Sequence, residues 1–144
     1  MTKRFSTPTG VVLVAIDMSK LRQEVLIERP EGGRRRRMTV MATKLDYDRL
    51  AADLAAIGRP ILVGFEATGN YHRTLAYRLL TAGFELRLIS SLALARTREA
   101  LHNGWDKNDP KDAQVILHML RIGATQAYVD PLAAGINDLQ ELSK

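Results

Sequence analysis

Six consecutive apolar residues, Val11–Ile16, restrict the fold of this chain more than any other stretch of the sequence. The run is rich in β-branched side chains, which is typical of a central strand that is covered on both faces. It is much shorter than the roughly 18–20 apolar residues that span a bilayer, and too short for the core of a signal peptide. We therefore predict a buried central strand in a soluble chain that is not exported and has no membrane partner.

Apolar periodicity and turn residues predict the other elements. Strands are expected at Glu24–Arg29, Arg36–Ala42, Ile61–Phe65 and Phe84–Leu88, and helices from the capping candidate Asp46 to Gly58, at Tyr71–Ala82, at Leu92–His102 and at Lys111–Ile122. The turn Pro30-Glu31-Gly32-Gly33 predicts that the second and third strands form an antiparallel hairpin. Three strands followed by alternating strands and helices favour an α/β fold, a mixed sheet flanked by helices.

The composition fits one globular domain. A length of 144 residues suffices for a single core, and 46% hydrophobic with 26% charged residues is close to the globular average, which argues against disorder. Residues 1–10 are polar and lack periodicity, so we expect a flexible tail. The absence of cysteine excludes disulfides and thiolate metal sites, and it is consistent with a cytoplasmic protein.

The charge is moderately positive. Twenty-one Lys and Arg against 16 Asp and Glu give +5, and arginine outnumbers lysine. Because the planar guanidinium group suits phosphate oxygens, a polyanionic partner is a reasonable first hypothesis. A charge of this size also occurs in proteins that do not bind nucleic acid, so the partner has to be argued from motifs.

Four acidic residues occupy positions where a site can form. Asp17 and Glu66 directly follow two predicted buried strands, and side chains beyond the carboxyl ends of adjacent strands can share one crevice. Asp109 and Asp112 are three residues apart, so they share a face if this segment is helical. Carboxylates held together raise one another's pKa values unless a cation offsets them, and Mg²⁺ or Mn²⁺ prefers such oxygen ligands. Paired ions of this kind support phosphoryl transfer.

Each acid also has a purely structural interpretation. Asp17 can form an Asx turn with the residues that follow, and Glu66 can be a solvated loop residue. Asp109, Pro110 and Asp112 match an N-cap, a first helical position and a capping-box acid. A capped helix start can also present a metal ligand, so these interpretations are compatible.

Three blocks of sequence together resemble the DEDD transposases of bacterial insertion sequences, recombinases guided by a structured bridge RNA. They are Ala15-Ile16-Asp17-Met18-Ser19-Lys20, Phe65-Glu66-Ala67-Thr68-Gly69-Asn70-Tyr71 and Lys107-Asn108-Asp109-Pro110-Lys111-Asp112-Ala113. The resemblance covers residues 11–130 and implies a RuvC-like, ribonuclease-H-like catalytic domain. It also implies that Asp17, Glu66, Asp109 and Asp112 are the catalytic acids that hold Mg²⁺ or Mn²⁺ at the scissile DNA phosphate. Asn108 departs from the threonine that the family often has there, at a position that is not a ligand.

The resemblance also implies parts beyond this chain. Family members continue into a second domain that contributes a serine nucleophile, so residues 131–144 are expected to begin a helical connection to it. The isolated domain is therefore expected to be inactive. The implied partners are DNA, a structured guide RNA and further copies of the chain, as a dimer or a larger assembly, in the bacterial cytoplasm with the nucleoid.

Basic residues are the candidates for contacts with nucleic acid. We expect phosphate contacts, which position a strand without reading its bases, from Arg34, Arg35, Arg36, Arg37, Arg96, Arg98 and Lys107. The alternative for the run Arg34–Arg37 is an exposed, solvated hairpin. Trp105 lies before Asp109 and can either stack on a base or, as we favour, pack against the domain.

Three other functions compete with a transposase domain. A stand-alone nuclease of the same fold would cleave without a second domain. An actin-like kinase lobe would use Asp17-Met18-Ser19-Lys20 to bind phosphate, but no later glycine-rich nucleotide loop follows. A non-catalytic nucleic-acid-binding module would use its acids only as helix caps and would not bind metal.

Overall fold

The computed structural model describes residues 10–67, 72–104 and 112–128, with the side chains of 102–104 excluded. These ranges form a six-stranded sheet and four helices. The strands are β1 (Val12–Asp17), β2 (Arg22–Glu28), β3 (Arg36–Met41), β4 (Ile61–Glu66), β5 (Glu85–Ile89) and β6 (Gln126–Ala127). The helices are α1 (Lys44–Ala56), α2 (Arg73–Thr81), α3 (Ser91–Gly104) and α4 (Asp112–Ile122).

The sheet is mixed, in the order β3-β2-β1-β4-β5-β6. Strand β2 lies between β1 and β3 and is antiparallel to both. Its pairing with β3 confirms the predicted hairpin. Strands β4 and β5 continue the sheet from β1 in parallel. Because β1 and β4 are central and parallel, their carboxyl ends lie next to each other at one edge of the sheet.

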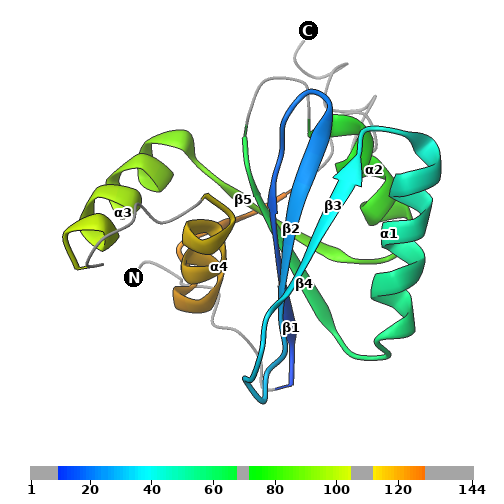
Figure 1. Cartoon of the computed structure of the whole chain (residues 1–144), viewed down its shortest axis with the longest axis horizontal. Coiled ribbons are helices and arrows are strands. Elements are labelled where there is room, and N and C mark those ends of the chain that lie inside the picture. Colours follow the sequence, from blue (N-terminus) through cyan, green and yellow to red (C-terminus); the bar gives the residue numbers. More distant parts are fainter. Residues whose placement is uncertain (1–9, 68–71, 105–111, 129–144) are drawn as a thin grey trace, which may run out of the picture.

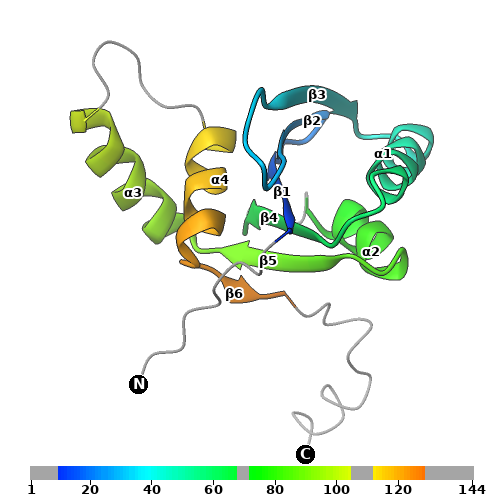
Figure 2. The same cartoon turned by 90° about the horizontal axis from the view of Figure 1, so that it is seen from below.

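Helices cover both faces of the sheet. Helices α1 and α2 lie on one side, and α3 and α4 lie on the other, as Figure 1 and the turned view of Figure 2 show. Helix α4 packs on β1, β2 and β4. Helix α3 packs on α4. The predicted α/β architecture is therefore confirmed.

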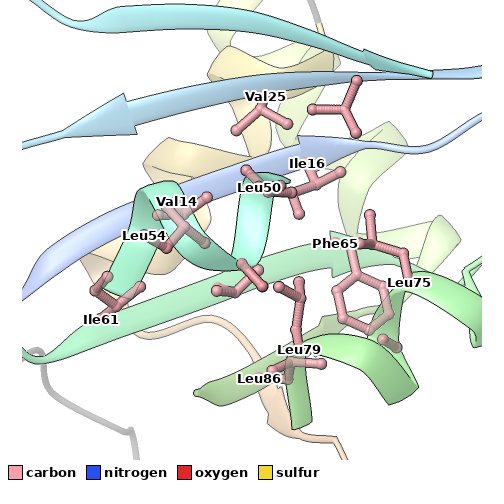
Figure 3. Close-up of a cluster of buried hydrophobic side chains, with 14 of the residues drawn as sticks. Val14, Ile16, Val25, Leu50, Leu54, Ile61, Phe65, Leu75, Leu79 and Leu86 are labelled. Carbon is pink, nitrogen blue, oxygen red and sulfur yellow. The ribbon is translucent and has the colours of Figure 1, made fainter. Parts of the chain in front are cut away.

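Each face of the sheet has its own hydrophobic core. Val12, Val14 and Ile16 of β1 point into the cluster under α1 and α2, part of which Figure 3 shows. Leu13 and Ala15 point into the cluster under α4. Since alternate side chains of a strand face opposite sides, the continuous apolar run predicted this double burial. The same alternation places Asp17, two residues after Ala15, on the α4 side of the sheet.

The amino-terminal cap of α1 differs from the prediction. Thr43, not Asp46, is the N-cap, and its hydroxyl oxygen accepts a hydrogen bond from the backbone N–H of Asp46 at 3.2 Å. The carboxylate of Asp46 instead accepts the backbone N–H of Met41 at 2.8 Å. Asp46 was a plausible cap by residue type, but the cap lies three residues earlier because Thr43 has the extended backbone that a cap requires.

Three smaller differences come from tertiary contacts. Strand β2 begins at Arg22, two residues before the predicted start, because its ladder with β3 extends to Met41. Arg87 of β5 is only 9% exposed, unlike most charged side chains, and forms an ion pair with Glu85. Strand β6 was not predicted, since two residues are too few to show a periodic pattern.

Two predicted segments lie outside the described residues, the tail apart from Gly10 and the helical connection at 131–144. Trp105 also lies outside them. Among the residues that the structure describes, no helix has the length and apolar character needed to cross a membrane.

Candidate functional site

Asp17 and Glu66 are the last residues of the neighbouring strands β1 and β4. The parallel register pairs Ile16 with Phe65, which directly precede the two acids. Asp17 and Glu66 therefore lie beside each other at the same edge of the sheet. Both side chains are half-buried. Glu66 therefore belongs to a strand end, unlike the solvated loop residue of the alternative interpretation.

Asp112 lies at the same edge of the sheet but belongs to a helix. It is the first residue of α4, which packs on β1. Its carboxylate forms an ion pair with the guanidinium group of Arg98 on the adjacent helix α3. The tertiary structure thus brings together three of the four sequence-predicted acids, whereas Asp109 and Lys107 lie outside the described residues.

The pKa of Asp17 is affected by the other acids at this edge. Its pKa is raised from 3.8 to about 6, mainly by burial and then by the carboxylates of Asp112, Glu66 and Glu24 in that order, against a smaller opposing effect of Arg98. An acid surrounded in this way carries its negative charge at a cost, because desolvation and like charges both disfavour ionisation. A cation at this position would remove that cost.

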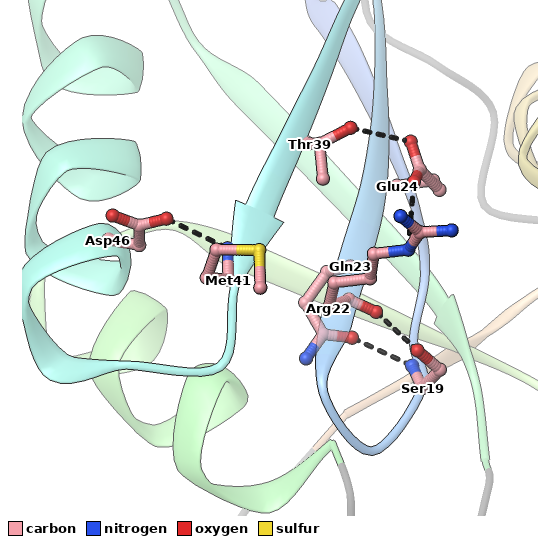
Figure 4. A network of polar contacts seen from close by, with 7 residues as sticks. All are labelled: Ser19, Arg22, Gln23, Glu24, Thr39, Met41 and Asp46. Atoms are coloured by element: carbon pink, nitrogen blue, oxygen red, sulfur yellow. Dashed lines mark hydrogen bonds and ion pairs between the residues drawn. The ribbon is translucent and has the colours of Figure 1, made fainter.

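Glu24 is a fourth acid at this edge that the sequence analysis did not identify. The antiparallel register pairs Asp17 with Glu24, and Glu24 with Thr39. Figure 4 shows the Thr39 hydroxyl donating to the Glu24 carboxylate at 3.1 Å and the Arg22 guanidinium 3.8 Å from it. The signal was available in principle: the predicted hairpin brings Glu24 near Asp17, but only the exact register shows that they are partners.

Other residues hold the turn that follows Asp17. The backbone N–H of Ser19 donates to the side-chain oxygen of Gln23 at 2.8 Å, and the Gln23 amide donates to the Tyr47 hydroxyl at 3.0 Å. Gln23 is completely buried, which makes this contact a fixed part of the turn. Within the described ranges the Asp17 side chain accepts no hydrogen bond, so the Asx-turn interpretation gains no support from the structure.

The donor set fits a hard divalent cation. It consists of carboxylates at a half-buried edge whose negative charge is only partly compensated by Arg98, which is the environment that Mg²⁺ and Mn²⁺ select. Among the described residues, no three acidic or imidazole groups are close enough to enclose one ion. A complete coordination sphere therefore requires ligands beyond these side chains, such as waters, substrate phosphate or the segment that contains Asp109.

The predicted basic residues have different surroundings. Arg34–Arg37 are all exposed, and Arg35 forms an ion pair with Glu28 at 3.1 Å. Arg96 is exposed on α3, whereas Arg98 on the same helix forms an ion pair with Asp112. The sequence had grouped Arg96 with Arg98, and only the packing of α3 on α4 separates them.

A cavity of about 290 Å³ opens beside the acids, between the first three strands and the start of α4. It is lined by Asp17, Glu24, Val25, Leu26, Arg37, Ala113 and Gln114. Asp17 therefore faces both the other carboxylates and a cavity whose volume is close to the lower limit of ordinary small-molecule sites.

Comparisons with known proteins identify a family and a fold. A family model described as a transposase, for DEDD enzymes of the IS110 type, matches residues 14–144. Among solved structures, "T. thermophilus RuvC in complex with Holliday junction substrate" is similar at 13% identity, covering 82% of this chain and 99% of that one with a TM-score of 0.51. That likeness supports a RuvC-like fold. A comparison with curated proteins finds no match.

Proposed function

Because the chain belongs to the DEDD transposase family of the IS110 type, we propose that it is the catalytic domain of a recombinase that cuts and rejoins DNA. The family and the RuvC-like fold make it a transposase domain of the nuclease type. The proposal extends this to metal-dependent strand cleavage and to the residues that carry it out. The observation that carries it is the convergence of Asp17, Glu66 and Asp112 at one edge of the sheet.

We assign the catalytic acids as Asp17, Glu66, Asp112 and Asp109, of which Asp109 lies outside the described residues. Two acids come from rigid central strands and one from the start of a packed helix, so their backbone positions are set by the core. In the proposed role, several carboxylates act on one DNA phosphate, and their backbone positions do not depend on loop geometry alone. Rigid placement matters because phosphoryl transfer depends mainly on positioning and on charge stabilisation.

These carboxylates would hold Mg²⁺ or Mn²⁺. When bound, such an ion supplies positive charge to phosphate oxygens and to the attacking and leaving groups. Asp17 and Glu66 orient their carboxylates toward the same edge, and Arg98 holds Asp112 near them. In the absence of a cation, Arg98 partly compensates the acidic group, as its lowering effect on the Asp17 pKa indicates.

Nucleic acid is the proposed partner. The RuvC structure that this fold resembles is described as bound to a Holliday junction substrate, and the basic residues supply phosphate contacts here. Four of the exposed arginines have no ion-pair partner among the described residues, which leaves their guanidinium groups available for phosphate: Arg34, Arg36, Arg37 and Arg96. A structured guide RNA, assembly of several copies, a second domain with the nucleophile, and action at the bacterial nucleoid remain part of the proposal through family membership.

The test is Mn²⁺ binding by the chain itself, measured by isothermal titration calorimetry. Asp17→Asn, Glu66→Gln and Asp112→Asn each remove one proposed ligand charge while keeping the side-chain size. We expect each to weaken Mn²⁺ affinity by at least about tenfold, since even the loss of outer-shell partners of metal ligands costs about 10–100-fold. Asp53→Asn is the matched control, because Asp53 lies on α1 across the sheet.

If the three ligand variants bound Mn²⁺ as tightly as Asp53→Asn and the unsubstituted chain do, a shared carboxylate site would be contradicted. A failure of the unsubstituted chain to bind Mn²⁺, both alone and with DNA present, would favour the non-catalytic binding module. Catalytic inactivity of the isolated chain is compatible with the proposal, because family members place the nucleophile in a second domain.

A further inference from the structure

We propose that the cavity beside Asp17 binds one nucleotide of the DNA strand that the carboxylates act on, with its phosphate at Arg37. The inference rests on the proposed function and adds a substrate subsite and a positioning residue to it. Its starting point is the location of the cavity, which lies between the β1–β3 side of the sheet and the first turn of α4.

The cavity and the acidic edge share a residue. Asp17 lines the cavity and is also the last residue of β1, beside Glu66 at the end of the neighbouring strand β4. A strand whose phosphate sits at these carboxylates must continue in both directions along its backbone. The cavity is the space next to Asp17 on the hairpin side, so the nucleotide that adjoins the reacting phosphate is its natural occupant.

Arg37 supplies the phosphate contact. It is the one residue of the run Arg34–Arg37 that lines the cavity. Its guanidinium group forms no ion pair with any residue in the described ranges, whereas Arg35 is bound to Glu28. Glu24 lines the same cavity but is engaged by Thr39 and Arg22. Arg37 therefore keeps its paired N–H donors for a phosphate, which they fit in a bidentate manner.

The rest of the lining suits a sugar and base better than a bare anion. Leu26 and Ala113 offer apolar surface, and Gln114 adds an amide. The carboxylate of Glu24 repels free phosphate from the interior, but it can accept a hydrogen bond from the amino group of a base. A volume of about 290 Å³ is at the lower limit of ordinary small-molecule sites, which suits one nucleotide and not a stretch of duplex.

The experiment measures binding of a short, fluorescein-labelled single-stranded DNA of mixed sequence by fluorescence anisotropy at several salt concentrations. Arg37→Gln should weaken binding by about three- to tenfold and lower the salt slope by about 0.7, the value for one phosphate contact on a single strand. Ala113→Leu should fill the cavity, weaken binding by a similar factor and leave the salt slope unchanged. Arg49→Gln, on α1 across the sheet, removes the same charge as a control.

Mn²⁺ titration of the same variants separates this inference from the proposed function. Arg37→Gln and Ala113→Leu should keep the Mn²⁺ affinity of the unsubstituted chain. If they do, but bind DNA as Arg49→Gln does, the nucleotide subsite is wrong while the metal site stands. If the unsubstituted chain binds no single-stranded DNA, the subsite is also wrong. An effect confined to an RNA of the same sequence would assign the cavity to RNA and overturn the DNA assignment. Arg37 is exposed, so Arg37→Gln remains informative even if Ala113→Leu fails to fold.

Discussion

Asp17 shows how strongly one residue can couple stability to function. Its carboxylate is half-buried beside three other acids, and its pKa is raised to about 6 by burial first and by its acidic neighbours second. The folded state therefore disfavours the ionised form that metal binding requires. Such a cost at a strand end is characteristic of functional sites, where perturbed pKa values concentrate.

Asp17→Asn should make the protein more stable at neutral pH. The folded-state pKa is above the unfolded value, so this residue's contribution to stability falls as pH rises from 3.8 to about 6 and stays low above that. After discounting for solvent screening, we expect a gain of about 1–2 kcal/mol at about pH 7 and almost none at about pH 3.5. Thermal unfolding followed by circular dichroism at both pH values measures this.

The metal supplies a second check on the same residue. Added Mn²⁺ should raise the melting temperature of the unsubstituted chain at neutral pH and have little effect on Asp17→Asn, since a ligand that binds only the folded state stabilises it. The Asp53→Asn variant should follow the unsubstituted chain throughout. If Asp17→Asn and the unsubstituted chain show the same dependence on pH, the raised pKa of Asp17 is wrong.

At the scale of elements, the contact between β4 and α4 sets the position of Asp112. Gly64 of β4 lies under Leu120 of α4, and a Cβ at Gly64 would be 2.6 Å from the Leu120 Cδ2 atom. Leu120 is 1% exposed, so its side chain has little room to move aside. The glycine therefore allows a close approach of helix and strand, and Asp112 at the start of α4 depends on that approach.

Gly64→Ala should separate these elements. We expect a loss of about 1–3 kcal/mol in the free energy of unfolding, as for overpacked cores, together with weaker Mn²⁺ binding because Asp112 moves. Urea denaturation measures the first effect and calorimetry the second. The pair Gly64→Ala with Leu120→Ala should be less destabilised than the sum of the single variants, because the second change removes the clash. Strict additivity would show that the contact does not govern the packing.

For the whole molecule, the two helical layers protect the sheet unevenly. Both faces of β1 are buried, while β3 is an edge strand with mostly exposed side chains. Local opening is easiest where few apolar contacts and unpaired strand edges occur. The hairpin strand that carries Arg37 should therefore be the adaptable side of the site, and β1 with Asp17 the rigid side.

Hydrogen exchange followed by mass spectrometry tests this division. Peptides from β1 should exchange slowest and in step with global unfolding, whereas peptides from β3 should exchange faster by local opening. Addition of Mn²⁺ should slow exchange at the start of α4 more than in α1, because α4 carries Asp112. Equal protection in β1 and β3 would contradict the uneven layering.

Much of the fold was predictable because the relevant signals are local. The unbroken apolar run of β1, the hairpin turn, and the positions of Asp17 and Glu66 after buried strands all follow from side-chain types along a few residues. The N-cap of α1 was mistaken because Thr43 and Asp46 both suit that role by residue type, and backbone conformation decides between them.

The sequence by itself determined the strands other than β6, the α/β class and the positions of Asp17 and Glu66 at two strand ends, because hydrophobic periodicity and strand ends are written in consecutive residues. Only the tertiary structure decided that Glu24 is the cross-strand partner of Asp17, that Arg98 is bound to Asp112, and that Arg37 lines the cavity. Those relations depend on strand register and helix packing between distant segments. They are fixed by how two hydrophobic cores fill space, which no local pattern of residues records.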